Sequence, residues 1–365
     1  MFGKNFFLFL LLFCTNITLF AEDNLRHYVL KNADILKIDQ TANERITTLT
    51  GDVHLIYDNI EFFADNAQIF QNQKKIKLTG NVKAIDDTLE TGAQKAKYFG
   101  DAKKLFLEKQ AYFIENSKEK KLRKVTANKI NYNRNEKIVI AEKNATAEDF
   151  TEDMILCANY IKYDLGAGCG VARQNPELIF LRDDTLKISS KQMEFFTNKK
   201  KFTATYDVKI ETKDTQTQSN FLLYFENMEK AILLGRPEFY SKTTDAFANE
   251  FHIYFKNENI EKLVLINNSE MHFKNKNQDN KINYLFAKNI QLHLKNEKIN
   301  YIYAIDVEES CIEQSQTEEE DFFKNKLTTK ELEVFFNLKE EVEKVIAKDE
   351  ISGRYSFHKN IKVKK

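Results

Sequence analysis

The five residues LTGDV at positions 49–53 recur almost unchanged as LTGNV at positions 78–82. Around the first copy, in ITTLTGDVHLIY, every second residue from Leu49 to Tyr57 is apolar or glycine. The segment IKLTGNVKA repeats this alternation around the second copy. A period of two with one apolar face predicts a β-strand that covers a core on one side. Gly51 and Gly80 fall on the apolar face, where glycine predicts a bend or a close backbone approach.

A second pattern follows each of these strands and then repeats along the chain. It has a small residue, an apolar residue three positions later and another two positions after that, as in Ala64, Ala67 and Ile69. Its copies begin at Ala33, Ala64, Ala93, Ala127, Ala158, Ser190, Asn220, Ala248, Ala287 and Thr329. A unit that recurs about every 30 residues indicates stacked supersecondary elements. We therefore predict one elongated, repetitive domain over residues 22–365.

Short polar segments separate the predicted strands. Segments 71–75, 133–137, 226–230 and 295–298 contain Asn and Lys, and an apolar run restarts after each. Alternating runs joined by such loops are typical of β-hairpins. The sequence therefore predicts an all-β fold, built as an elongated stack of antiparallel hairpins.

The apolar face of this stack must be buried. Folding the stack into two facing sheets, as in an open jellyroll or a sandwich, achieves that. If the sheets are not sealed along one side, the interior becomes a continuous apolar groove that suits an acyl chain. The two ends of the stack leave unpaired strand edges, to which another β-protein can add a strand.

Composition excludes several other classes of protein. The chain has 55 basic and 55 acidic residues, and this zero net charge gives no electrostatic case for a nucleic-acid partner. We find no phosphate-binding glycine loop, no nucleophile elbow and no His, Cys or carboxylate set with metal-ligand spacing. The sequence thus predicts no enzyme, no metal site and no cofactor. Cys157 and Cys169 pair only if neighbouring strands bring them together, and otherwise are small buried residues.

The first 21 residues have a different character from the rest. Lys4 precedes an unbroken apolar stretch, 6–14, and Ala21 ends the segment before Glu22. This is the architecture of a secretory signal peptide, and the apolar stretch is short for a membrane span. We predict a signal peptide at residues 1–21 and an exported, periplasmic chain. If the signal is not cleaved, it would anchor the domain to the inner membrane.

Two late segments interrupt the regular spacing. Residues 306–321 are rich in Asp and Glu and contain no Lys or Arg, which predicts a solvated acidic loop. Beyond it, KELEVFFNLKEEVEKVIAK also fits an apolar helical face. The register of the repeat instead predicts strands over residues 328–365, and we favour the strands.

The repeated motifs resemble a known family. LTGDV followed by FFADNAQIF, and LTGNV followed by TGAQKAKYF, resemble the OstA-like domain of lipopolysaccharide-transport proteins of the LptA, LptC and LptD types. The resemblance covers residues 30–165 best and returns at 332–351. It implies an open β-jellyroll that holds lipid acyl chains. It also implies end-to-end strand addition between such proteins, which bridges two membranes.

From the resemblance we expect a non-enzymatic periplasmic protein that carries lipopolysaccharide or a related glycolipid. Its groove would be lined by the apolar face of the first repeats, namely Leu49, Val53, Leu55, Tyr57, Ile69, Ile76, Leu78, Val82 and Tyr98. The alternative for these residues is a closed core. The alternatives for the protein are an envelope scaffold without lipid and an adhesin-like repeat protein.

Overall fold

The computed structural model describes residues 28–358, apart from 117–120, 152, 182–185, 257–258, 275–281, 296–297, 316–321 and 338–341. The predicted signal peptide at 1–21 lies outside the described residues. In the described part, 26 strands form a single antiparallel sheet. None of its helices is long and apolar enough to cross a bilayer.

The strands follow one another along the chain. The strands of the first half are β1 Val29–Asn32, β2 Ile35–Gln40, β3 Arg45–Tyr57, β4 Ile60–Phe70, β5 Lys75–Ile85, β6 Leu89–Phe99, β7 Lys104–Asn116, β8 Lys121–Asn133, β9 Ile138–Asp149 and β10 Met154–Asp164. The following strands are β11 Cys169–Arg173, β12 Glu177–Phe180, β13 Leu186–Ser189, β14 Gln192–Phe196, β15 Lys201–Glu211, β16 Thr215–Phe225, β17 Lys230–Leu234, β18 Glu238–Ser241, β19 Thr244–Phe247 and β20 Glu250–Lys256. The last are β21 Asn259–Lys274, β22 Ile282–Lys295, β23 Lys298–Ser315, β24 Phe322–Phe336, β25 Val342–Lys348 and β26 Ser352–His358. Two 3-10 turns, η1 Thr197–Lys199 and η2 Glu226–Met228, lie between strands.

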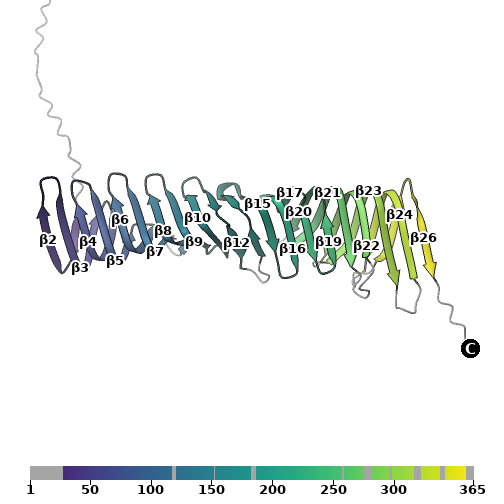
Figure 1. Ribbon diagram of the computed structural model, residues 1–365, viewed down its shortest axis with the longest axis horizontal. Helices are drawn as coiled ribbons and strands as arrows, with labels where there is room; N and C mark the ends of the chain where they lie inside the picture. Colours follow the sequence, from purple (N-terminus) through teal and green to yellow (C-terminus); the bar gives the residue numbers. More distant parts are fainter. Residues whose placement is uncertain are drawn as a thin grey trace, which may run out of the picture.

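Each long strand, such as those from β3 to β10, is bent near its middle, so that it contributes one arm to each of two facing walls. The β3–β4 ladder is regular on both sides of an irregularity between Thr50 and Val53, and β5–β6 has the same break between Thr79 and Val82. Elsewhere the bend splits the strand, because β11 and β12 both pair with β10. The hairpins therefore stack along one long axis, from β1 and β2 at one end to β26 at the other (Figure 1).

Left-handed residues make the bend in alternate strands. Gly51 and Asp52 have φ values of 79° and 39°, and Gly80 and Asn81 have 77° and 45°. Because two consecutive residues take the left-handed conformation, side chains alternate between inward and outward in the same phase on both sides of the bend. Leu49 and Val53 therefore both point inward, and each is 1% exposed. Pairs without glycine, such as Lys109 and Gln110, make the same bend farther along the chain.

An aspartate side chain of the neighbouring chain segment packs against each of the bends at Gly51 and Gly80. A Cβ atom at Gly80 would lie 2.7 Å from Cγ of Asp65 and even closer to its carboxylate oxygen. Asn81 Nδ2 donates to both carboxylate oxygens of Asp65 at 3.2 Å. Gly51 has the same relation to Asp34, whose Cγ would be 2.6 Å from an added Cβ. The small residue and the polar residue after it in the second motif therefore pack against the bend of the first motif.

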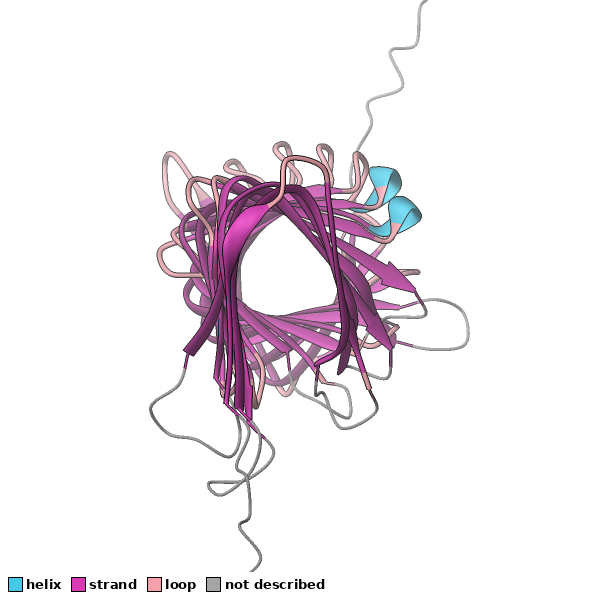
Figure 2. Cartoon of the chain, turned by 90° about the vertical axis from the view of Figure 1, so that its right-hand side faces the viewer, coloured by secondary structure: helices cyan, strands magenta, loops and turns pink. Residues whose placement is uncertain are grey.

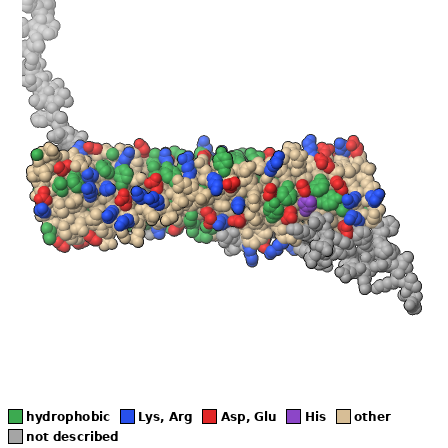
Figure 3. Space-filling view, in the orientation of Figure 1, with side chains coloured by type: hydrophobic (Ala, Val, Ile, Leu, Met, Phe, Trp, Pro, Cys, Tyr) green, Lys and Arg blue, Asp and Glu red, His purple; other side chains and the backbone are tan. Residues whose placement is uncertain are grey.

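The two walls enclose an apolar interior, which the end-on view shows surrounded by strands (Figure 2). Among the described residues, the buried polar side chains are all Ser or Thr. The outer surface carries positive and negative side chains interspersed along the face that Figure 3 shows. This distribution agrees with the zero net charge of the chain.

The predicted fold class is confirmed, since the chain is an elongated, all-β jellyroll of antiparallel hairpins. Two local predictions were wrong. Residues 306–315 of the predicted acidic loop belong to β23, whereas 316–321 lie outside the described residues. The motif copy assigned to Asn220 begins at Ser219, because Ser219 and Leu222 are buried while Asn220 is exposed. A slip of one residue moves every side chain of a strand to the opposite face.

The late segment is built of strands and not of a helix. β24 and β25 cover most of the stretch from Leu332 to Lys348, in which an apolar helical face was the alternative. β26 follows and ends at His358, and the residues beyond it lie outside the described part.

Candidate functional site

The nine predicted groove residues lie together on the inner face of β3 to β6. Their exposed fractions range from 0% at Leu55 to 6% at Tyr57. They are Leu49, Val53, Leu55, Tyr57, Ile69, Ile76, Leu78, Val82 and Tyr98, and all belong to one apolar cluster. In this conformation they form a filled core. Contact between these residues and a lipid therefore requires the two walls to move apart, and it stays a prediction.

Aromatic rings join the two walls in this first half of the jellyroll. Tyr98 lies with its ring centroid 5.4 Å from that of Phe62 and 6.0 Å from that of Tyr57. Phe113 and Tyr132 meet in the same way at 5.2 Å. Because each pair comes from opposite walls, these contacts fill the interior from side to side.

The hairpin turns form two rows that run along the molecule opposite the bends. The first turn row contains segments 71–74, 100–103, 134–137, 165–168, 197–200 and 226–229. The second turn row contains segments 58–59, 86–88, 212–214 and 242–243. Between the rows runs a seam, which is the place where the interior is either sealed or accessible.

A polar network closes the seam in the first half. We call it the clasp, and it consists of Tyr28, Asp58, Gln71, Asp86, Tyr98 and Arg134. Arg134, in the first turn row, donates from Nη1 to the backbone carbonyl of Asp58 at 2.9 Å, and its Nε lies 3.5 Å from Oδ2 of Asp86. Both aspartates belong to the second turn row. Their side chains are only 16% and 14% exposed, so this network is shielded more than an ordinary surface ion pair.

Tyrosine hydroxyls complete the clasp. Tyr98 donates from its hydroxyl to Oδ2 of Asp58 at 2.8 Å, and Gln71 Nε2 donates to the Tyr28 hydroxyl at 2.7 Å. Burial, then the hydrogen bond to Asp58, raises the pKa of Tyr98 well above its usual range. Burial and the nearby Asp86 raise the pKa of Tyr132 to about 12. Tyr98 therefore stays protonated and remains a hydrogen-bond donor at any physiological pH.

One more contact crosses the seam near the middle of the molecule. Arg123, next to the second turn row, points to the Tyr163 hydroxyl at 3.5 Å, and its guanidinium lies 5.6 Å from the Tyr163 ring centroid. The same arginine donates from Nε to Asp149 at 3.0 Å. The polar contacts across the seam that we find among the described residues thus extend from Tyr28 to Tyr163.

The second half has a different lining. Inward apolar side chains beside the seam are only half-buried there, and they include Phe180, Leu186, Phe195, Ile210, Tyr224, Phe239 and Ile253. The Phe195 ring centroid lies 5.2 Å from that of Phe202 on the same wall. Nearer the C-terminal end, Phe273 and Phe336 come from opposite walls, and their ring centroids lie 6.4 Å apart. The sequence motif does identify Phe195 as an inward residue, because Phe195 occupies the motif position that Tyr98 occupies in the first half. The groove predicted from the sequence covers the first repeats only.

Both ends of the stack expose apolar side chains. Ile35 and Leu36 of β2 are 62% and 51% exposed, and Tyr355 of β26 is 62% exposed. One side of each terminal strand has no neighbour within the described chain. These edges are therefore available for pairing with a further strand.

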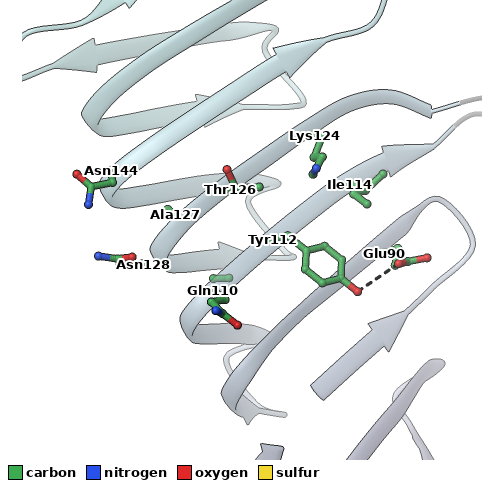
Figure 4. A pocket seen from close by; sticks show the side chains of 10 residues that line it. Glu90, Gln110, Tyr112, Ile114, Lys124, Thr126, Ala127, Asn128 and Asn144 are labelled. Carbon is green, nitrogen blue, oxygen red and sulfur yellow. Dashed lines mark hydrogen bonds between the residues drawn. The ribbon is translucent and has the colours of Figure 1, made fainter. Parts of the chain in front are cut away.

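The outer surface of the described residues is hollowed in places. A hollow of about 540 Å³ lies outside the bend of β7 and β8, and Tyr112 donates there to Oε1 of Glu90 at 3.2 Å (Figure 4). Its other lining groups are mostly amides, lysine and small residues.

No group of three or more His, Cys, Asp or Glu in the described part could hold a metal ion. Cys157 and Cys169 are both free, because they lie at opposite ends of adjacent strands.

The fold and its interior define an elongated β-jellyroll protein with an apolar core. Residues 32–168 match the family described as LptA/(LptD N-terminal domain) LPS transport protein. This segment is therefore LptA-like, as the resemblance of the motifs predicted. A search among curated proteins finds no match.

Among solved structures, the chain is similar to LptH, the LptA-homologous periplasmic component of the lipopolysaccharide transport device from Pseudomonas aeruginosa. The identity is 9%, the alignment covers 28% of this chain and 74% of that chain, and the TM-score is 0.26. At this TM-score the structural similarity carries no argument, and the LptA-like character of residues 32–168 rests on their sequence match.

Proposed function

We propose that the chain is a non-enzymatic periplasmic carrier of lipopolysaccharide or a related acylated glycolipid. The observation that supports this most directly is the continuous apolar interior, whose buried polar groups in the described residues are neutral hydroxyls. Burial of a charged group without a partner is costly, so such an interior suits acyl chains while the headgroup stays in water. The LptA-like segment at residues 32–168 supports the same function.

The exposed strand edges support a bridge between membranes. The terminal strands β2 and β26 expose Ile35, Leu36 and Tyr355, which a second jellyroll could cover by strand addition. Other LptA-like proteins are the partners that this geometry favours. The export signal predicted at residues 1–21 would deliver the chain to the periplasm, where such partners act.

A lipid-free scaffold is the second candidate, and the filled core between β3 and β6 favours it. Native mass spectrometry of the protein, purified from its own cells without detergent, distinguishes the two. We expect a population of molecules whose added mass corresponds to an acylated glycolipid. Lipid-free protein alone, monomeric or assembled end to end, would contradict the carrier and favour the scaffold.

A further inference from the structure

The hollow outside the bend of β7 and β8 exists because outward side chains of β7 lean toward β6. Tyr112 donates from its hydroxyl to Oε1 of Glu90 at 3.2 Å, and Gln110 Oε1 accepts from Nε2 of Gln94 at 3.0 Å. Figure 4 shows the Tyr112 ring extending from β7 toward Glu90. The space that opens on the β8 side has a volume of about 540 Å³, and its ten lining residues all belong to the described part.

Small residues on the neighbouring strands permit this arrangement. Gly92 of β6 and Thr126 of β8 are the register partners of Tyr112. A Cβ atom at Gly92 would lie 2.5 Å from Cε1 of Tyr112, so the ring occupies the place that a larger side chain would take. Burial, then the charge of Glu90, raises the pKa of Tyr112 to about 12, which keeps the hydroxyl protonated and bonded to Glu90. The ring is therefore held in place before any ligand arrives.

Three carboxamide side chains line the hollow at the bends. Gln110, Asn128 and Asn144 come from the successive strands β7, β8 and β9. Each carboxamide can both donate and accept hydrogen bonds. Gln110 and Asn144 belong to left-handed pairs that make the bends, with φ values of 52° and 55°. The backbone thus places a row of neutral hydrogen-bonding groups along one side of the hollow.

The remaining lining groups restrict the chemistry of an occupant. Tyr112 and Ile114 form an apolar side, and the register partners of Ile114, Glu90 and Lys124, bring one negative and one positive charge. These balanced charges give no preference for an anion or a cation. A hydrocarbon chain would remove water from the carboxamides without replacing its hydrogen bonds, which is costly. A saccharide fits both sides, because it carries hydroxyl groups around a ring whose faces expose C–H groups.

We propose that the hollow between β7 and β8 binds a saccharide, with one sugar ring against Tyr112 and its neighbours bonded to the carboxamides of the row. The volume lies within the range of about 300 to 1,000 Å³ that small-ligand sites have. Adjacent strands are about 4.8 Å apart, which is close to the length of one sugar unit in a linear chain. The site lies over the bends, on the edge opposite the seam, so it goes beyond the carrier function and does not depend on it.

The fluorescence of a single tryptophan tests this site, because the chain has no tryptophan of its own. Tyr112→Trp places an indole at the hollow. Phe106→Trp is the matched control, since Phe106 lies on the same strand but on the outer face of the other wall. The probes are chitotriose, cellotriose and the deacylated saccharide of lipopolysaccharide. We expect at least one of them to change the emission of the Tyr112→Trp variant saturably, and none to change that of the Phe106→Trp variant.

Saturation-transfer NMR on the chain without substitutions gives a second measurement that does not depend on how a variant folds. The probe that binds should receive saturation from the protein. Asn128→Ala removes an exposed carboxamide of the row and should weaken binding about fivefold, the loss expected for one neutral hydrogen bond. Asn131→Ala, on the same strand but on the other wall, should leave the affinity unchanged.

The probe that binds most tightly identifies the source of the saccharide. Preference for chitotriose supports a glycan with acetamido groups, preference for cellotriose a neutral glycan, and preference for the deacylated saccharide the glycan of a glycolipid. Saturation transfer to none of the three probes would overturn the site, as would equal effects of Asn128→Ala and Asn131→Ala. Either of these results would leave the carrier function intact, since that function is tested by the lipid that copurifies with the protein.

Discussion

Replacing Gly80 with valine is expected to lower the free energy of unfolding by about 3 kcal/mol, because the new side chain meets two obstacles. The backbone at Gly80 has φ of 77°, which a β-branched residue adopts only with strain. Its Cβ would also overlap the carboxylate of Asp65, which lies in place across the bend and accepts two hydrogen bonds from Asn81. Urea unfolding followed by circular dichroism measures the loss.

Gly166 provides the control for this substitution. It lies in an exposed turn, its φ is not left-handed, and the nearest atom to an added Cβ is 3.4 Å away in the side chain of Asp164. Gly166→Ala should therefore change the unfolding midpoint little. An unchanged midpoint for Gly80→Val, together with the same result for the control, would show that the bend does not need its glycine.

Replacing Arg134 with alanine is expected to open the first half of the seam. The substitution leaves the shielded carboxylates of Asp58 and Asp86 without their cation, which should cost about 2 kcal/mol of stability. A photoreactive p-benzoylphenylalanine in place of Phe113 reports whether radiolabelled lipid A reaches the interior. If the clasp closes the path of the lipid, crosslinking at position 113 should become at least threefold faster in the Arg134→Ala variant. Hydrogen exchange should accelerate in the hairpin turns at 58–59 and 86–88.

Arg173→Ala is the matched control for the clasp. Arg173 is an exposed arginine that donates from Nε to Gln192 at 3.0 Å, away from the seam. Its replacement should leave both the free energy of unfolding and the rate of lipid A crosslinking at position 113 nearly unchanged. If Arg134→Ala destabilises the chain but leaves the labelling rate unchanged, the clasp is a structural bridge and does not control access.

Local patterns predicted the repeat, the hairpins and the fold class. The alternation around Gly51 and Gly80 was sufficient, because a period of two appears in a single stretch of chain. The bends at Lys109 and Gln110 were not predictable in this way, since these residue types seldom adopt a left-handed conformation. The slip at Ser219 arose because Leu222 and Leu223 are both apolar, so that two registers fit the motif equally well.

The candidate site was only partly accessible to sequence reasoning. The inward positions of the first repeats follow from the alternation of apolar and polar residues, and all nine predicted groove residues are buried. Whether an inward position is sealed depends on the opposite wall, and that depends on contacts between distant residues. Asp58 and Arg134 are 76 residues apart, and the sequence around either residue does not predict the contact between them. The half-exposed row at Phe195 and Phe239 results from the same kind of long-range difference.

The most direct test of the central claim, that acyl chains occupy the interior, exploits the absence of tryptophan from this chain. A single tryptophan is placed inward by Phe195→Trp or outward by Phe196→Trp, and a phospholipid with a nitroxide on its acyl chain is added as a contact quencher. The account predicts strong quenching of the inward tryptophan that unlabelled lipopolysaccharide reverses by competition, with little quenching of its outward neighbour. Equal quenching at the two positions, or none at the inward one, would contradict it.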